Sequence, residues 1–418
     1  MKYILTLLLP LQLYAQEVDT LNLDELVREA LRNNPELKAL EYTRDMMELR
    51  TESVGTLPDP EFTYMREEMP RFRWNAAMMG KFGLMQMFPF PGKLSTETEI
   101  AGIRAEHAHH EHMEKANEVL AKLRSMYFEL WFVQQSTALN RENLRLLEQF
   151  TTIAQTRYGV GQSPQQDVLK AFVEIARLEN QLVALRQQEL SAKAMLMSLL
   201  GRSPLDTLGV AAVPPNIGFL PTLDTLHQTA YRFRGMLLHD SLSVEEGEKM
   251  KSLAKKEYLP DFRLGIEFLR MPNNPGYRAW SVSAGITLPF APWSLSRTSA
   301  KVEEASIGVD RARENLKNSR NMIRANISDL YFRAESFTRQ LENYTTVIVP
   351  QTQQALQAGM MAYQTGKTDF LMLIDSYRML VEVTMEKLML RMQCEQAVAE
   401  LKREVGYAGI FEVQRERN

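Results

Sequence analysis

Four histidines between residues 107 and 112 are the side chains best suited, by type and spacing, to hold a metal ion. His107 and His110 are three residues apart, as are His109 and His112, so each pair lies on one face if the segment is helical. Neutral imidazole is a common metal ligand. His107 and His110 are therefore candidates, although weak ones, for a transient site of a divalent metal. A solvated helix face explains the same residues without a ligand, and we favour that interpretation.

The chain contains 24 methionines and a single cysteine, Cys394. Six methionines gather within one short segment, at Met65, Met69, Met78, Met79, Met85 and Met87. Thioethers suit copper(I), but methionine also fills irregular apolar surface, and we favour the second explanation for each of them. One cysteine excludes an intrachain disulfide, and its spacing from Leu390 and Leu401 predicts a buried position.

No group of residues has the pattern of a catalytic centre. The sequence lacks a phosphate-cradling glycine loop, a nucleophile elbow and an HExxH motif. The formal net charge is −3 and there is no basic stripe, so nucleic acid is not an expected partner. We therefore expect a protein that is not an enzyme and that needs no cofactor.

Long helices with heptad spacing are the main elements that we expect. Apolar residues alternate steps of four and three in three segments, beginning at Ala116, Ala171 and Ile323. This spacing predicts an apolar seam for coiled-coil packing. The run from Lys93 to Arg157 contains no proline and would extend roughly 100 Å as one helix.

Two segments with period-two alternation predict strands, over residues 262–268 and 280–288. Weaker equivalents surround Phe62 and Phe82, and a turn-rich segment, Pro272 to Gly276, separates the two stronger strands. The simplest interpretation of these four segments is a pair of half-buried hairpins in a soluble protein. If instead they span a membrane, four strands cannot close a barrel, which needs about eight. The chain would then have to oligomerise, and a trimer would supply twelve strands.

The chain repeats itself at a spacing of about 200 residues, which indicates duplication of a whole structural half. Paired segments occur in the same order, for example Phe88-Pro89-Phe90 with Leu288-Pro289-Phe290, and Tyr158 to Ser163 with Tyr363 to Thr368. The prolines from Pro214 to Pro221 form the natural linker. We predict a signal peptide over 1–15, a first repeat over 16–214 and a second over 215–418, with the two repeats in one integrated domain.

These residues resemble the TolC family of outer-membrane efflux proteins over essentially the whole mature chain. The strongest marks are the segment Asn33 to Leu37, the Leu-Pro-Asp-Pro entry to the first strand, and Arg157-Tyr158 with Gly161, Ser163 and Asp167. Phe90-Pro91-Gly92-Lys93 resembles the branch that serves heavy-metal pumps. The resemblance implies a mainly α fold with β: long antiparallel helices forming an α-barrel, and four strands in a trimeric twelve-stranded transmembrane β-barrel.

The resemblance also implies partners and a location. They are a homotrimer in the lipid of the bacterial outer membrane extending into the periplasm, a periplasmic adaptor and an inner-membrane RND-type pump. The exported substrate stays open among metal ions, drugs and polypeptides. The alternative is a soluble periplasmic coiled-coil adaptor or scaffold, which would have no strands in the membrane.

Two helix breaks are the candidate functional sites. Gly161 and Gly366 allow the chain to reverse, and Ser163 and Thr368 are plausible N-caps of the helices that follow. The resemblance implies that these turns dock on the adaptor. It also places Asp167 and Tyr363 in a gate latch and Asp375 in an acidic ring, whereas Thr368, beside Lys367, replaces the expected arginine and Met372 replaces the other acid.

Overall fold

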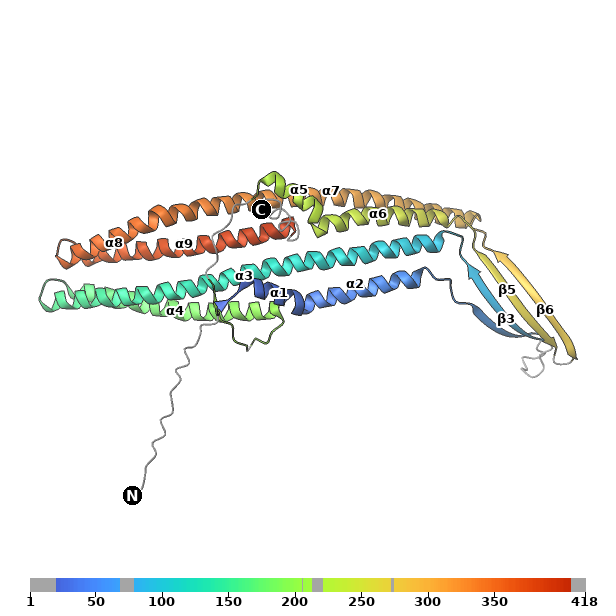
Figure 1. Ribbon diagram of the computed structural model, residues 1–418, viewed down its shortest axis with the longest axis horizontal. Coiled ribbons are helices and arrows are strands. Elements are labelled where there is room, and N and C mark those ends of the chain that lie inside the picture. Colours follow the sequence, from blue (N-terminus) through green and yellow to red (C-terminus); the bar gives the residue numbers. More distant parts are fainter. Residues whose placement is uncertain (1–19, 68–78, 205, 213–220, 272–273, 407–418) are drawn as a thin grey trace, which may run out of the picture. The chain divides into compact units, whose positions relative to one another are not determined.

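The computed structural model describes residues 20–67, 79–204, 206–212, 221–271 and 274–406 (Figure 1). Within these residues the fold is mostly helical with one four-stranded sheet, as the sequence predicted. The predicted signal peptide and the predicted repeat boundary at residues 214/215 lie outside the described residues. The chain divides into two compact units: unit 1 comprises 1–34, 119–220 and 330–401, and unit 2 comprises 35–118, 221–329 and 402–418.

The order helix, helix, strand, strand, long helix, long helix occurs twice along the chain. The first series is α1 (Leu23–Asn33), α2 (Pro35–Val54), β2 (Glu61–Glu67), β3 (Met79–Phe88), α3 (Lys93–Gly159) and α4 (Gln165–Leu200). The second is α5 (Leu223–Phe233), α6 (Gly235–Lys256), β5 (Phe262–Met271), β6 (Asn274–Ile286), α7 (Pro292–Asn343), a π-helix η3 (Tyr344–Ile348), α8 (Val349–Gln364) and α9 (Phe370–Val405). Short strands β1 (Thr20–Leu21) and β4 (Val210–Ala211) pair in parallel.

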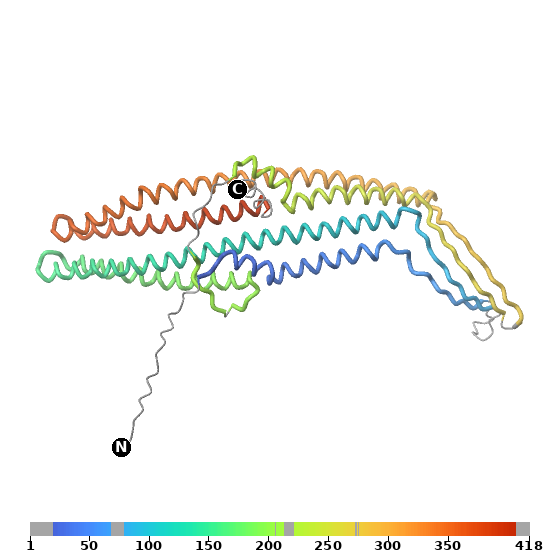
Figure 2. The backbone as a smooth tube through the Cα atoms, in the orientation of Figure 1, coloured from blue at the N-terminus to red at the C-terminus, as the bar shows by residue number. Residues whose placement is uncertain are grey.

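Unit 1 is built from two helical hairpins, whose turns are visible in Figure 2. The hairpin of α3 and α4 and the hairpin of α8 and α9 share one apolar core near their turns. Its largest fully buried members are Phe150, Tyr363, Phe370 and Leu373. Cys394 is also fully buried, as its heptad position predicted, and its Sγ lies 3.4 Å from the hydroxyl of Thr338.

The 67-residue helix α3 forms because the segment contains no proline between its ends. Gly92, with φ +94°, allows the sharp turn from β3 into this helix. At the end of α4, Gly201 adopts the left-handed conformation that closes many helices.

Unit 2 contains an antiparallel sheet with the strand order β2-β3-β5-β6. The strands match the predicted segments, but residues 274–276 of the predicted turn belong to β6, and 272–273 lie outside the described residues. The helices of unit 2 include α2, α6 and parts of α3 and α7. In the described part of the chain, no helix is long and apolar enough to cross a membrane.

Candidate functional site

Each hairpin of unit 1 reverses at a turn centred on a glycine with positive φ, as the sequence predicted. Gly161 has φ +73° and Gly366 has φ +71°, a conformation that residues with a side chain rarely adopt. The same backbone hydrogen bond, from an N–H to the carbonyl five residues earlier, occurs in each turn. The N–H of Gln162 donates to the carbonyl of Arg157 at 2.8 Å, and the N–H of Lys367 donates to that of Ala362 at 2.9 Å.

The predicted N-caps at these turns are wrong. The hydroxyl of Ser163 donates to the carbonyl of Ala154 at 3.5 Å, and α4 begins after Pro164 without a side-chain cap. In the second turn, the hydroxyl of Thr368 donates to the sulfur of Met372 at 3.1 Å. The cap of α9 is Asp369, whose carboxylate accepts a hydrogen bond from the Met372 N–H at 2.9 Å. Asp369 directly precedes the first residue of α9, whereas Thr368 lies one residue further from the helix, and aspartate is preferred to threonine as an N-cap.

The structure brings the two predicted latch residues together within a single chain. The Tyr363 hydroxyl donates to the Asp167 carboxylate at 3.5 Å, and the Tyr363 side chain is 1% exposed. Burial raises the pKa of Asp167 above its usual value. Burial and the nearby Asp167 carboxylate also raise the pKa of Tyr363. The pair therefore joins α4 to α8 at the turns.

Arg157, at the end of α3, connects the first turn to the second. Its guanidinium lies 4.7 Å from the centre of the Tyr363 ring and donates to the Tyr363 carbonyl. The same group donates to the Gln162 carbonyl at 3.4 Å. An arginine is well suited to this position because its planar group can stack on a ring and donate several hydrogen bonds at once.

The predicted acidic-ring residue Asp375 lies on α9 with a side chain that is 61% exposed. It is 3.7 Å from Arg378, which also pairs with the buried carboxylate of Glu174 on α4. Met372, at the other expected ring position, is 65% exposed. Lys367 is exposed at the second turn.

The histidines lie in unit 2, where His107 of α3 contacts two residues of α6. Its Nε2 is 3.4 Å from Glu246 of α6, and its ring centre is 4.2 Å from that of His239. His107, together with Arg104 at 2.7 Å, holds the pKa of Glu246 down to about 2. Burial lowers the pKa of His110. Among the residues that the structure describes, no three His, Cys, Asp or Glu side chains are arranged to hold a metal, so the metal role of His107 and His110 stays a prediction.

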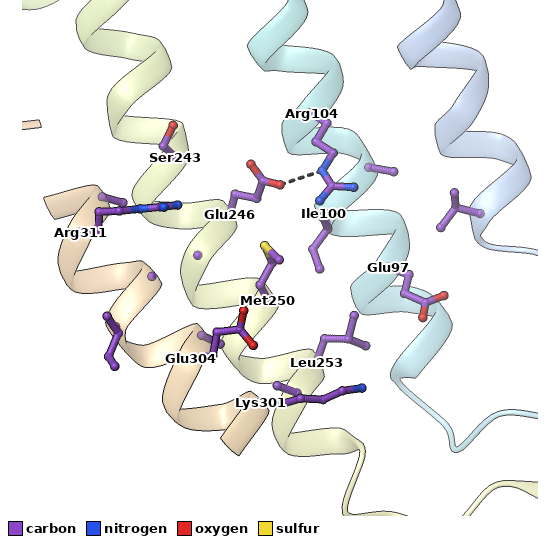
Figure 3. A pocket seen from close by; sticks show the side chains of 18 of the residues that line it. Glu97, Ile100, Arg104, Ser243, Glu246, Met250, Leu253, Lys301, Glu304 and Arg311 are labelled. Atoms are coloured by element: carbon purple, nitrogen blue, oxygen red, sulfur yellow. Dashed lines mark hydrogen bonds and ion pairs between the residues drawn. The ribbon is translucent and has the colours of Figure 1, made fainter. Parts of the chain in front are cut away.

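A cavity of about 920 Å³ in unit 2 lies next to this cluster, lined by residues of α2, α3, α6 and α7. Figure 3 shows its charged side chains, with Arg104 of α3 paired to Glu246 of α6. Lys301 of α7, also in its wall, pairs with Glu257 at 2.8 Å. These two pairs join α6 and the residue after it to α3 and to α7.

The sequence model of a protein family described as "Outer membrane efflux protein" matches residues 26–202 and 237–407. The chain belongs to this family. The match includes both turns, both strand pairs and all four long helical segments. It confirms the resemblance to the TolC family of outer-membrane efflux proteins.

Solved structures with the same fold include several outer-membrane channels. The Campylobacter jejuni CmeC outer membrane channel is 13% identical, with a TM-score of 0.79, covering 93% of this chain and 86% of that one. The open state of the Neisseria gonorrhoeae MtrE outer membrane channel is 15% identical, with a TM-score of 0.78, covering 92% and 88%. CusC, studied for its folding and transmembrane channel formation, is 16% identical, with a TM-score of 0.80, covering 92% of both chains. A comparison with curated protein sequences found no match.

The motif that resembled the heavy-metal branch, Phe90 to Lys93, stabilises the junction between strands and helices. Lys93 pairs with Asp261 at 2.7 Å, and the Phe90 N–H donates to the same carboxylate at 2.8 Å. Lys256 donates to the Gly92 carbonyl at 2.8 Å. Membership of the heavy-metal branch stays a prediction.

Arg157 is the residue at the turns whose contacts the sequence did not predict. The sequence marks it only as part of an Arg-Tyr motif, and the resemblance puts the latch arginine at the position that Thr368 occupies. The available signal was the position of Arg157 four residues before Gly161, which places it at the C-terminal end of a helix, where its charge is favourable.

Proposed function

We propose that this chain is the outer-membrane channel of a tripartite efflux system. It works as a homotrimer and a passive duct, in the outer membrane and the periplasm, for substrates that an inner-membrane RND-type pump delivers through a periplasmic adaptor. The observation that carries this proposal is the sheet of unit 2, which exposes large apolar side chains in continuous rows.

Two of these rows cross all four strands in register. One row consists of Phe62, Leu84, Ile266 and Val282, and the next consists of Tyr64, Phe82, Phe268 and Trp280. Val282 is 79% exposed, Trp280 is 69% exposed and Phe62 is 68% exposed. The alternate row, Thr63, Gly83, Glu267 and Ser281, is small or polar. A sheet with one apolar and one polar face suits a position between lipid and water.

The edges of this sheet support an oligomer. In the described residues, β2 pairs only with β3, and β6 pairs only with β5. An unpaired strand edge is not tolerated in lipid, because its N–H and C=O groups lack partners there. Copies of the chain joined edge to edge remove this cost, and three copies give a closed barrel of twelve strands, a size that can hold an open channel.

Fractionation and conductance measurements test the channel. We expect a trimer in the outer-membrane fraction that dissociates on heating, and discrete conductance when the purified protein is added to planar bilayers. Cysteines introduced in pairs, one along β2 and one along β6, should give crosslinked trimers, while each single cysteine should not. Release of the chain by osmotic shock would instead support the soluble adaptor or scaffold.

The turns of unit 1 form the proposed gate and docking tips. The gate consists of Asp167, Tyr363, Lys367 and Asp375: the partly buried Asp167–Tyr363 contact holds α4 to α8, and the exposed Lys367 and Asp375 narrow the bore. Gly161, Ser163, Gly366 and Thr368 shape the surfaces on which the adaptor docks. This gate differs from the latch that the resemblance implies in the position of its arginine. Arg157, which contacts Tyr363 of the same chain, takes part in it in place of an arginine at position 368. The double variant D167A/Y363F should leak small solutes and show raised conductance. Conductance equal to wild type would exclude this gate.

We also propose that the two repeats, 16–214 and 215–418, arose by duplication, which the repeated element order supports. Heavy-metal cations are the proposed substrates. Silver and zinc susceptibility of a deletion strain, with and without the restored gene, tests this substrate class directly.

A further inference from the structure

A single stripe of α9 consists entirely of thioether and carboxylate side chains. Its members follow steps of three and four residues, which places them on one helix face: Met372, Asp375, Met379, Glu382, Glu386 and Met389. The three methionines are exposed, at 65%, 55% and 41% respectively. The Met372 sulfur accepts a hydrogen bond from Thr368, so it can be reached by a polar group.

The stripe lies on the side of α9 that faces away from the core of unit 1. Phe370, Leu373, Ile374 and Tyr377 fill that core and are at most 3% exposed.

The corresponding helix of the first hairpin has no such stripe. Like α9, α4 has 36 residues and follows a glycine turn. Counted from the first residue of each helix, its matching positions carry no sulfur: Asp167, Lys170, Glu174, Arg177, Gln181 and Ala184. The methionines therefore do not belong to the common helix pattern and need an explanation specific to α9.

Thioethers are soft ligands that bind copper(I), and silver(I) is a soft ion of the same charge that prefers the same kind of ligand. Within one α9, Met372 and Met379 are about two turns, or roughly 10 Å, apart along the axis, too far for both to hold one ion. A single chain therefore supplies one sulfur at each level. Three chains around a common axis would supply three sulfurs at the level of Met372 and three at the level of Met379, with Asp375 between them to attract cations.

We propose that the α9 stripe binds soft monovalent cations, copper(I) or silver(I), in rings formed by Met372 and by Met379 of three copies. The inference rests on the proposed homotrimer and names a substrate class for it. Asp375 and Glu382 supply negative charge between the rings, although Arg378 at 3.7 Å offsets part of the charge on Asp375.

Silver binding to the purified trimer tests this inference. All proteins carry Cys394→Ala, because the thiol is also a soft ligand, and they are titrated with silver nitrate in chloride-free buffer by calorimetry. We expect the M372L/M379L variant to lose about one silver ion per trimer for each ring removed. Leucine keeps the volume and apolar character of methionine, so folding should be preserved.

A matched control changes two exposed methionines outside the stripe, Met195 of α4 and Met361 of α8, to leucine. This M195L/M361L variant should bind silver like the parent. Binding to the rings should also persist at pH 5, because a thioether is not protonated there, whereas silver held by histidines would be released.

Native mass spectrometry and bilayer conductance of the same samples separate the two proposals. If no trimer or no conductance is found, the channel proposal fails. If a conducting trimer binds silver equally with and without Met372 and Met379, or does not bind it, the channel stands and the stripe does not bind metal. In the supported case, silver blocks the current of the parent, and this block is lost in M372L/M379L.

Discussion

The turns at Gly161 and Gly366 have the same backbone but different side-chain environments. Each carries a tyrosine three residues before the glycine, yet Tyr158 is 47% exposed and Tyr363 is 1% exposed. Arg157 and Asp167, both from the first hairpin, contact Tyr363 of the second. The glycine thus determines how the backbone reverses in each turn. A few side chains of the first hairpin determine that the second turn, and not the first, has a buried tyrosine.

The helices that lead into these turns also differ. The first, α3, is one continuous α-helix, whereas the second route passes from α7 through the π-helix η3 into α8. Pro350, just after η3, has no N–H to donate, which accounts for an interrupted hydrogen-bond ladder there. The Tyr344 hydroxyl in η3 donates to Glu386 at 2.5 Å and ties the irregular turn to α9.

Removing the buried tyrosine should have the largest effect. Tyr363→Ala leaves a cavity in the core shared by four helices and is expected to destabilise it by about 3–5 kcal/mol. The matched change Tyr158→Ala should alter stability by about 0.5 kcal/mol or less, because that ring is exposed. Hydrogen–deuterium exchange of peptides from both turns measures the difference. Equal protection in the two variants would mean that the asymmetry has no energetic basis.

Removing the arginine should have a smaller effect that reaches both turns. Arg157→Ala eliminates bonds from a charged donor to two carbonyls, and because one of these bonds is exposed we expect a net loss of about 1.5–3 kcal/mol. We expect faster exchange around residues 158–163 and also around 363–368. Arg177→Ala is the control, because that side chain is 68% exposed and its ion pair with Glu174, at 3.5 Å, is weak. A change confined to the first turn would contradict the connecting role of Arg157.

The glycine variants test whether the two backbones are equivalent. Gly161→Ala and Gly366→Ala each force a side chain into the left-handed region, at a cost of about 1–2 kcal/mol. A Cβ on Gly161 meets open space, whereas one on Gly366 lies 3.4 Å from the Arg157 guanidinium. We therefore expect similar losses in thermal stability, slightly larger for Gly366→Ala. A loss at only one position would show that the turns are not equivalent.

The long helices, the strand segments and the turn glycines could be predicted from the sequence, because periodicity, proline placement and glycine determine them locally. The pairing of Asp167 with Tyr363 followed only from the family resemblance. Nothing local distinguishes Tyr158 from Tyr363, since their burial depends on packing between two hairpins about 200 residues apart in sequence. The same reason explains why Arg157 was missed and why His107 pairs with Glu246 and His239 of α6. The capping error arose because Thr368 and Asp369 are adjacent and either side chain could have capped α9.

The smallest expected effect concerns the protonation of Asp167. Burial raises the pKa of its carboxyl in the folded protein above the ordinary 3.8, so the folded state binds the proton more tightly than the unfolded chain does. The resulting stabilisation of the turns is complete below the ordinary pKa and is lost as pH rises through the raised one. Asp167→Asn should remove this slope in hydrogen exchange corrected for intrinsic rates, whereas Asp375→Asn, at a 61% exposed position, should keep it. If Asp167→Asn keeps the slope as well, another group near Tyr363 must carry the proton, and the Asp167–Tyr363 contact would not be what distinguishes the second turn from the first.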